Sequence, residues 1–208
     1  MLHFVFIIAL VIAIAAIFWL VLRSSAAKIS QQYALLAEHL GLELNQPLAK
    51  MGGFLRPEPS LYGDYRGREL SISVPGKGLQ NTRQVETVLK VEVRRLTLNA
   101  QLTATGPLSG LRQRDSGGLP RWKSGDAAFD QAIDARTDQP DALHPLLNQE
   151  SRVWLASVLR QSKGTLYLGK GKLVYARLGL IANETTRQEL EAAVEFLCDL
   201  AETVEVTK

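Results

Sequence analysis

Few residues in this 208-residue sequence have the side chains on which disulfides and metal sites depend. Cys198 is the one cysteine, so no disulfide can form within the chain. Of the three histidines, His3 borders an apolar run, and only His39 and His144 lie elsewhere. Zinc sites need several Cys or His ligands at short spacings, which this set cannot supply. We therefore expect no metal and no other cofactor.

Formal charge is absent from residues 2–22, which are rich in Ile, Ala, Leu and Val. About 20 apolar residues are enough for a helix to cross a bilayer, and a helix pairs its own backbone polar groups. No Lys or Arg precedes the run, and the run is longer than the apolar part of most signal peptides. We predict a transmembrane anchor over residues 1–24. A cleaved signal peptide, with a cleavage-like sequence at residues 24–26, and a buried core helix are the alternatives.

Basic residues flank only one end of this run. Arg23 and Lys28 follow it, whereas the amino group and His3 stand at the other end. The positive-inside rule therefore places the rest of the chain in the cytoplasm. Because only two basic residues set this bias, a periplasmic location is the alternative.

Two stretches have the alternation of β-hairpins. In residues 61–74 apolar and polar residues alternate on both sides of a turn at residues 65–68. Residues 165–178 repeat the pattern around Gly169-Lys170-Gly171. This second turn matches the start of a phosphate-binding loop, but Gly171 stands where that loop needs Ser or Thr, and a strand pattern follows it. We therefore predict a hairpin there.

Three stretches have the spacing of helices before the last one. Residues 25–44 predict an amphipathic helix that leads out of the anchor and ends at Gly41. Residues 140–147 and 150–161 predict two short helices. We expect the apolar face of the second to consist of Val153, Trp154, Ser157 and Val158.

The clearest helix pattern lies at the C-terminal end. Thr186 and Glu189 have the spacing of a capping box. An apolar stripe then runs from Leu190 to Val204 and predicts a helix of about five turns. Cys198 falls on this stripe, so we expect it to be a core residue.

The patterns of two further stretches predict strands with one solvent-exposed face. In residues 85–105 the apolar parity changes at Arg94-Arg95, which requires a bulge or tight turn there. The polar set expected on its solvated face is Thr97, Asn99, Gln101, Thr103 and Thr105. Residues 127–137 also alternate, and acidic residues recur at every fourth position. We expect this acidic set to be a solvated face and a cation site to be its alternative: Asp126, Asp130, Asp134 and Asp138.

Charge and turn residues divide the remaining chain. Residues 52–125 hold 12 Lys or Arg and 6 Asp or Glu, whereas residues 126–208 hold 9 and 13. Gly, Pro and Ser gather in residues 106–125. We predict an α+β protein with a basic β-rich lobe at 45–105, a linker at 106–125 and an acidic α+β lobe at 126–208. No nucleic-acid recognition motif accompanies the basic residues, so no nucleic acid is expected as a partner.

Two short groups of residues carry a family resemblance. The first consists of Gly63, Tyr65, Gly67 and Arg68, and the second of Gly125, Asp126, Phe129 and Asp130. Together with the anchor, they resemble bacterial single-span inner-membrane proteins of uncharacterised function. The resemblance implies an inner-membrane location and brings no catalytic residues with it.

Three functions are compatible with these features. The leading hypothesis is a membrane-anchored interaction or scaffold domain, whose partners are the bilayer and another protein or a second copy of the chain. The alternative is a binder of a lipid headgroup or small anionic ligand at the membrane surface. Its candidate residues are Arg66, Arg68, Arg94 and Arg95. A solid core favours the first function, and an apolar cavity with convergent arginines favours the second.

A membrane-tethered hydrolase is the weaker alternative. It requires Asp126 and Asp130 to meet His144 in a cleft. Neither His39 nor His144 has an evident nucleophile beside it in the sequence, so no catalytic residue is assigned.

Overall fold

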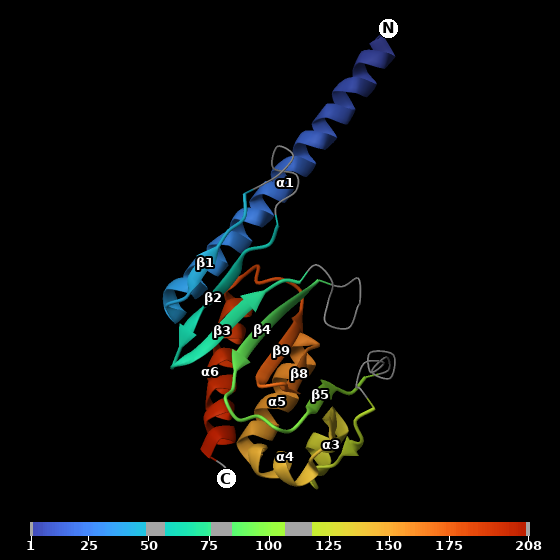
Figure 1. Cartoon of the computed structure of the whole chain (residues 1–208). Helices are drawn as coiled ribbons and strands as arrows, with labels where there is room; N and C mark the ends of the chain where they lie inside the picture. The colour runs from blue at the N-terminus through green and yellow to red at the C-terminus, as the bar shows by residue number, and fades with distance from the viewer. Residues whose placement is uncertain (1, 49–56, 76–84, 107–117, 207–208) are drawn as a thin grey trace.

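The computed structural model describes residues 2–48, 57–75, 85–106 and 118–206. Within these residues nine strands form one antiparallel sheet in the order β1-β2-β3-β4-β9-β8-β5-β7-β6 (Figure 1). The strands are β1 (Glu43–Asn45), β2 (Ser60–Tyr65), β3 (Arg68–Ser73), β4 (Glu86–Glu92), β5 (Ala100–Ala104), β6 (Arg121–Trp122), β7 (Ile133–Thr137), β8 (Thr165–Gly169) and β9 (Lys172–Leu178). The helices are α1 (Leu2–Leu40), α3 (Ala127–Ala132), α4 (Pro140–Leu146), α5 (Gln149–Ser162) and α6 (Glu184–Val206). The predicted α+β class, with hairpins and a long C-terminal helix, is confirmed.

Helix α1 runs without a break from the apolar run into the folded domain. The large apolar side chains between Phe6 and Leu22 are exposed, whereas Tyr33 and Leu36 are fully buried. The helix ends before Gly41, whose φ of 65° is one that glycine adopts without a Cβ clash. The predicted anchor and amphipathic helix are therefore one element, and its second part packs on the domain.

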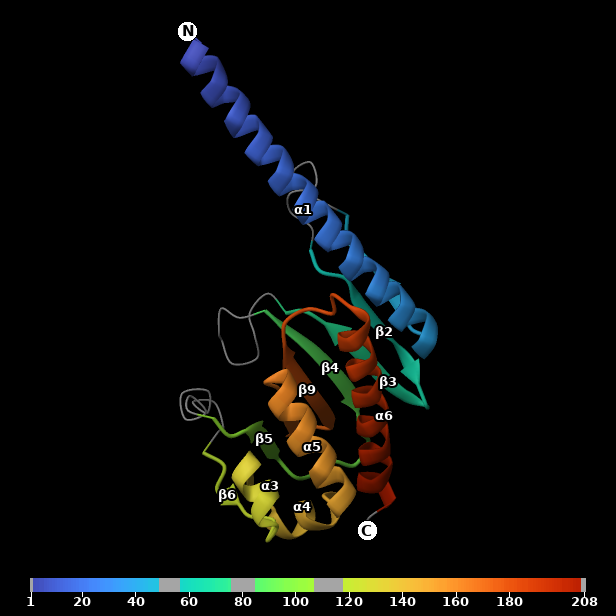
Figure 2. The same cartoon turned by 180° about the vertical axis from the view of Figure 1, so that it is seen from behind.

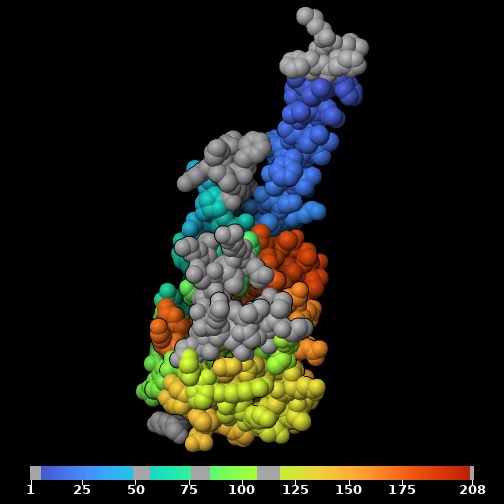
Figure 3. Space-filling view, turned by 90° about the vertical axis from the view of Figure 1, so that its right-hand side faces the viewer, coloured from blue at the N-terminus to red at the C-terminus, as the bar shows by residue number. Residues whose placement is uncertain are grey.

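Among the described residues, one helix is long and apolar enough to cross a membrane, and it lies near the N-terminus. Its most apolar window is not buried in the protein. A membrane anchor and a signal sequence share these two properties. Figure 3 shows that this helix leaves the domain at one end, opposite the yellow segment that contains α3 and α4.

Both predicted hairpins are confirmed. Strands β2 and β3 join through Arg66 and Gly67, which have φ values of 53° and 74°. Strands β8 and β9 join through Lys170 and Gly171, with φ values of 52° and 71°. Two consecutive residues with positive φ match the right-handed twist of the paired strands. The second turn connects two strands, so it has no phosphate-binding loop geometry.

Strands β4 and β5 are separate, and the chain turns between them at Arg94 and Arg95 as predicted. They are not neighbours, because β9 and β8 lie between them. The predicted solvated polar face is right only in part: Thr97 and Asn99 are exposed, whereas Gln101 and Thr103, on β5, are each 3% exposed. Their polar atoms interact with one another and with Thr165, at N–O and O–O distances of 3.5 Å. Burial is tolerated because these groups have polar neighbours.

Residues 127–137 are not one strand, contrary to the prediction. Helix α3 comes first, and β7 follows it directly. Asp126 is the N-cap of α3 and accepts hydrogen bonds from the backbone N–H groups of Ala128 and Phe129. An N-cap carboxylate favours the helix over the strand because it satisfies N–H groups that the helix leaves unpaired. No group of acidic, His or Cys residues in the described part of the chain is arranged to hold a metal.

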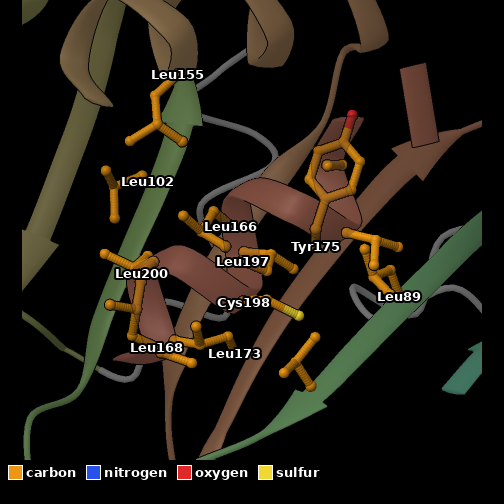
Figure 4. Packing of buried hydrophobic residues seen from close by; sticks show 14 of the residues in the cluster. Leu89, Leu102, Leu155, Leu166, Leu168, Leu173, Tyr175, Leu197, Cys198 and Leu200 are labelled. Carbon is orange, nitrogen blue, oxygen red and sulfur yellow. The ribbon is translucent and has the colours of Figure 1, made fainter. Parts of the chain in front are cut away.

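Helices α5 and α6 cover one face of the sheet (Figure 2). The predicted stripe of α6 is buried, with Leu197 at 1% and Cys198 at 0% exposure. Figure 4 shows these side chains directed at sheet residues such as Leu166 and Leu173. The cap differs from the prediction, because the helix begins three residues earlier. The Asn183 side chain accepts a hydrogen bond from the Thr186 N–H at 2.9 Å.

The predicted apolar face of α5 is right only in part. Trp154 and Val158 are partly buried against the core, whereas Val153 is 66% exposed and Ser157 is exposed. The buried residues of α5 are Leu155, Leu159 and Ser162. Leu155 and Leu159 are four residues apart and therefore lie on the same side of the helix, which packs against the domain.

Strands from both predicted lobes join the same sheet. Strand β4 of the segment 45–105 pairs with β9 of the segment 126–208 from Glu86 to Glu92. The boundaries at 106–125 stay a prediction, since residues 107–117 lie outside the described part of the chain.

Candidate functional site

Arg66, in the turn between β2 and β3, is surrounded by carboxylates of α6. Its Nη1 lies 2.8 Å from Asp199 Oδ1 and 3.0 Å from Glu195 Oε2, and its Nη2 lies 2.8 Å from Glu202 Oε1. The hydrogen bond with Asp199 is the main cause of a raised pKa of Arg66. Tyr65 donates a further hydrogen bond to Glu195. One guanidinium thus meets three carboxylates that are spaced one turn apart on α6.

Arg68 makes a two-pronged ion pair with Glu205. Its Nη1 and Nη2 lie 2.8 and 2.9 Å from the two carboxylate oxygens. The backbone N–H of Arg94 also donates to Glu205, at 2.9 Å. Hydrogen bonds from Arg68 and Arg94 lower the pKa of Glu205 to about 2. The last turn of α6 is therefore fastened to the β2–β3 hairpin and to the turn after β4.

The candidate anion-binding residues thus lie near one another, but most of their polar groups face α6. Arg66 and Arg68 have carboxylate partners within the chain, and the Arg94 backbone shares one of them. Arg95 is exposed in the turn beyond β4. An anion site at these four residues stays a prediction, and their internal partners argue against it because an anion would compete with carboxylates already in place.

The residues proposed for a hydrolase have structural contacts. Asp130 accepts hydrogen bonds from the Ser124 N–H and hydroxyl at 2.8 Å, and Asp126 caps α3. The ring of His144 lies edge-on to Trp122 at a centroid distance of 6.2 Å. The contacts described for His144 include neither carboxylate. The geometry does not assemble an acid, a base and a nucleophile from this set.

A surface groove lies where α5 and α6 meet. Gln161 donates to Glu189 at 2.8 Å, and seven residues away on each helix the rings of Trp154 and Phe196 stack. Residue numbers rise on one helix as they fall on the other, so the helices are antiparallel. Both rings are half-buried. Both rings line the groove, and one side of each is exposed to solvent.

Three adjoining hollows make up this groove, which we call the α5–α6 groove. The central one has a volume of about 510 Å³. It shares Glu150 and Trp154 with the hollow at the start of α5 and Asp199 and Thr203 with the one at the end of α6. Its lining residues are Leu146, Asn148, Glu150, Ser151, Trp154, Ala192, Glu195, Phe196, Asp199, Leu200 and Thr203.

The α5–α6 groove combines apolar and acidic character. Val153, on the flank of α5, and Val206, at the end of α6, are 66% and 79% exposed. The lining of the groove includes four carboxylates, Glu150, Glu195, Asp199 and Glu202, of which the last three are hydrogen-bonded to Arg66. Aromatic rings are enriched at protein-binding surfaces, where they supply contact area, and charges around them help to select the partner. This arrangement is suited to binding.

Sequence reasoning did not find this groove. It placed Trp154 on a helix face but did not single out Phe196. The sequence did contain a signal for it. Phe196 directly precedes Leu197 and so lies at the edge of the buried stripe of α6, where a large ring remains partly exposed to solvent.

No family model matches this sequence, and no curated protein matches it significantly. One solved structure is similar in fold: the mycobacterial trehalose monomycolate transport factor A, TtfA, with a TM-score of 0.58 and 12% sequence identity. The match covers 84% of this chain and 95% of the TtfA chain. At this identity the similarity concerns the fold alone. This chain therefore shares with TtfA an α+β architecture.

Proposed function

We propose that this chain is a membrane-anchored interaction domain that binds a protein partner in the α5–α6 groove and serves the transport of an envelope lipid. The observation that carries the proposal is the aromatic, acidic groove on a domain joined to an apolar helix without a break. Because α1 is one continuous helix, it would hold the domain, and any partner bound to it, at a fixed distance from the bilayer.

The properties of α1 support anchoring. Its exposed apolar side chains extend to Leu22, and its first fully buried side chain is Tyr33. Eleven residues of helix separate these two, which corresponds to about 16 Å. The domain would therefore sit close to the membrane. The groove would lie on the side of the domain, with its α6 end far from the membrane, since the C-terminal end of α6 lies opposite the free end of α1 (Figure 1). We propose a cytoplasmic location from Arg23 and Lys28.

The charge of the groove favours a protein over a lipid headgroup. Most headgroups of bacterial membranes that carry net charge are anionic, and the four carboxylates, which Arg66 compensates only in part, would repel them. The well-filled core beneath α5 and α6 supports the same choice, because core residues such as Leu155 and Leu197 are at most 1% exposed. An acyl chain would need a cavity in that layer.

The role in lipid transport rests on analogy of fold with TtfA, which is named as a trehalose monomycolate transport factor. Fold similarity at 12% identity raises this role as a proposal and does not identify the lipid. Deleting the chain in the organism that makes it should slow delivery of a labelled envelope lipid, and the full-length chain should restore it. Restoration by the Phe196→Ala chain to the same rate would argue against the groove as the site of this role.

Site-specific crosslinking tests the binding proposal. A photoreactive residue at Val153, in the groove, should yield a discrete protein adduct in native membranes. The matched control is Tyr62, which is 49% exposed on β2. The adduct at position 153 should disappear with Phe196→Ala, and position 62 should give none. Equal adducts at both positions, or an adduct that survives Phe196→Ala, would contradict the proposal.

A further inference from the structure

We infer that the occupant of the α5–α6 groove is a basic amphipathic helix of the partner protein. This inference rests on the proposed function and adds the chemistry and the secondary structure of the partner segment. Three features of the described groove carry it: its length, its walls and its charge.

The length of the groove matches a helix of about four turns. Along α6 its lining runs from Ala192 to Val206, which are 14 residues apart. At 1.5 Å per residue this corresponds to about 21 Å. Apolar contacts are offered by Trp154 and Phe196 within the groove, by Val153 on the flank of α5 and by Val206 at the end of α6. A partner helix would place apolar residues one or two turns apart over these points.

The walls of the groove favour a helix over an extended strand. Both walls are helices, whose backbone groups already form internal hydrogen bonds, so the groove offers no sheet edge to which a strand could add. Two antiparallel helices leave a furrow into which a third helix packs through its side chains. Figure 2 shows α5 and α6 on the outside of the molecule, with no further helix drawn over them.

The charge of the groove selects a basic partner. Glu195, Asp199 and Glu202 follow one another at intervals of four and three residues, and their side chains are 50%, 65% and 51% exposed. Arg66 provides one positive charge for these three negative ones. Lys or Arg residues at the same helical intervals would pair with the carboxylates that remain uncompensated. Glu150 adds a fourth carboxylate on the α5 side.

A second copy of this chain does not supply such a helix from its described part. Helix α6 holds Arg187 as its one Lys or Arg among seven acidic residues, and the membrane-facing part of α1 is apolar. Helix α5 packs its own apolar side, with Leu155 and Leu159, against the domain. A membrane surface is also disfavoured as the occupant of the groove, because its anionic lipids would be repelled by the carboxylates.

The test measures binding of defined peptides to the full-length chain in nanodiscs of zwitterionic phosphatidylcholine. The probes are a fluorescent 14-residue Leu/Lys helix, its Leu/Glu counterpart, and a Leu/Lys peptide of the same composition without amphipathic order. Empty nanodiscs correct for binding to lipid. We expect the first peptide to bind at least about tenfold more tightly than the other two, with an affinity that falls as salt rises.

Two double variants, each of which removes two negative charges, test whether binding depends on the groove carboxylates or only on the net charge of the chain. Asp199→Asn with Glu150→Gln should weaken binding of the Leu/Lys helix by about tenfold. Glu38→Gln with Glu69→Gln removes two exposed carboxylates elsewhere and should leave it unchanged. Equal weakening by both double variants would overturn the inference.

Arg66→Gln gives an effect in the opposite direction. It frees Glu195, Asp199 and Glu202 from their internal partner, so binding of the Leu/Lys helix should tighten by a few-fold at low salt. The ion pairs are largely exposed, so the fold should persist. Weaker binding by a folded Arg66→Gln chain would contradict the inference. If the crosslink at Val153 depends on the groove but the chain shows no preference for the Leu/Lys helix, the inference of a basic partner helix is wrong. The proposal of an interaction domain would then still hold.

Discussion

The indole ring of Trp154 stacks on the phenyl ring of Phe196, with centroids 4.1 Å apart and an angle of 14° between the planes. The pair joins α5 to α6 and remains half-exposed at their seam. Both rings pack against the core with one side and stay partly exposed on the other, so they also contribute apolar area to the surface. The groove that they line is the surface at which we propose that a partner binds.

Neighbouring residues of α6 should respond differently to truncation. Leu197→Ala should lower the free energy of unfolding by about 2–5 kcal/mol, because this side chain is buried against the sheet. Phe196→Ala should cost less, about 1–2 kcal/mol, since its ring is half-buried and loses mainly the stacking contact. Urea unfolding of the full chain in detergent, followed by circular dichroism, measures both. A larger loss for Phe196→Ala would mean that the ring belongs to the core.

The ion pair of Glu205 should make stability depend on pH. Its pKa in the folded chain, about 2, lies below its ordinary value of 4.5. A lowered carboxylate pKa adds stability above the ordinary value, and this stability is lost as the pH falls from about 4.5 toward 2. Glu205→Gln should therefore be less stable than the unmodified chain at pH 7, and the difference should shrink over that range. Unfolding free energies of both chains at several pH values test this.

The control for this pH series is Glu38→Gln, which changes an exposed carboxylate on α1. It should leave the slope of stability against pH unchanged between pH 4.5 and 2. A slope in the Glu205→Gln chain equal to that of the unmodified chain would show that the pair with Arg68 does not contribute.

Cys198 should be inert while the chain is folded. Burial raises the pKa of its thiol to about 11, and its side chain is fully buried. The thiolate is the reactive form, so maleimide should label it only after denaturation. In a Val153→Cys variant, the introduced thiol should react in the native state because position 153 is 66% exposed. Labelling of Cys198 at the rate of position 153 would contradict the described packing of α6.

The orientation of the domain follows from residues next to the apolar run. A fluorescent protein fused after Lys208 should be fluorescent, and alkaline phosphatase at the same point should be inactive, if the domain is cytoplasmic. Replacing Arg23 and Lys28 with Glu should weaken or reverse this orientation. Lys123→Glu should not, because it lies too far along the chain to count in the charge bias. An active phosphatase fusion in the unmodified chain would place the partner in the periplasm.

Local pattern was enough to predict much of the fold. The apolar run predicted a long helix, alternation and turn residues predicted the β2–β3 and β8–β9 hairpins, and the stripe after Leu190 predicted the buried face of α6. Each of these features depends on residues within a few positions of one another, where side-chain direction follows directly from the period of the helix or strand. The anchor-like helix, the α+β class and the core position of Cys198 were therefore determined by the sequence alone.

The site was decided by contacts between distant residues. Arg66 meets Glu195, Asp199 and Glu202 across 129 to 136 positions, and Trp154 reaches Phe196 from another helix. Likewise, Gln101 is buried on a face that it shares with Arg136 of β7 and Tyr167 of β8, its partners in the sheet, and alternation within one strand does not reveal these neighbours. Periodicity tells which side of an element is apolar, but not which other element will lie against it. Only the tertiary structure pairs the α6 carboxylates with a hairpin arginine and leaves two rings at a surface seam, because the order of strands in a sheet depends on the packing of the whole chain.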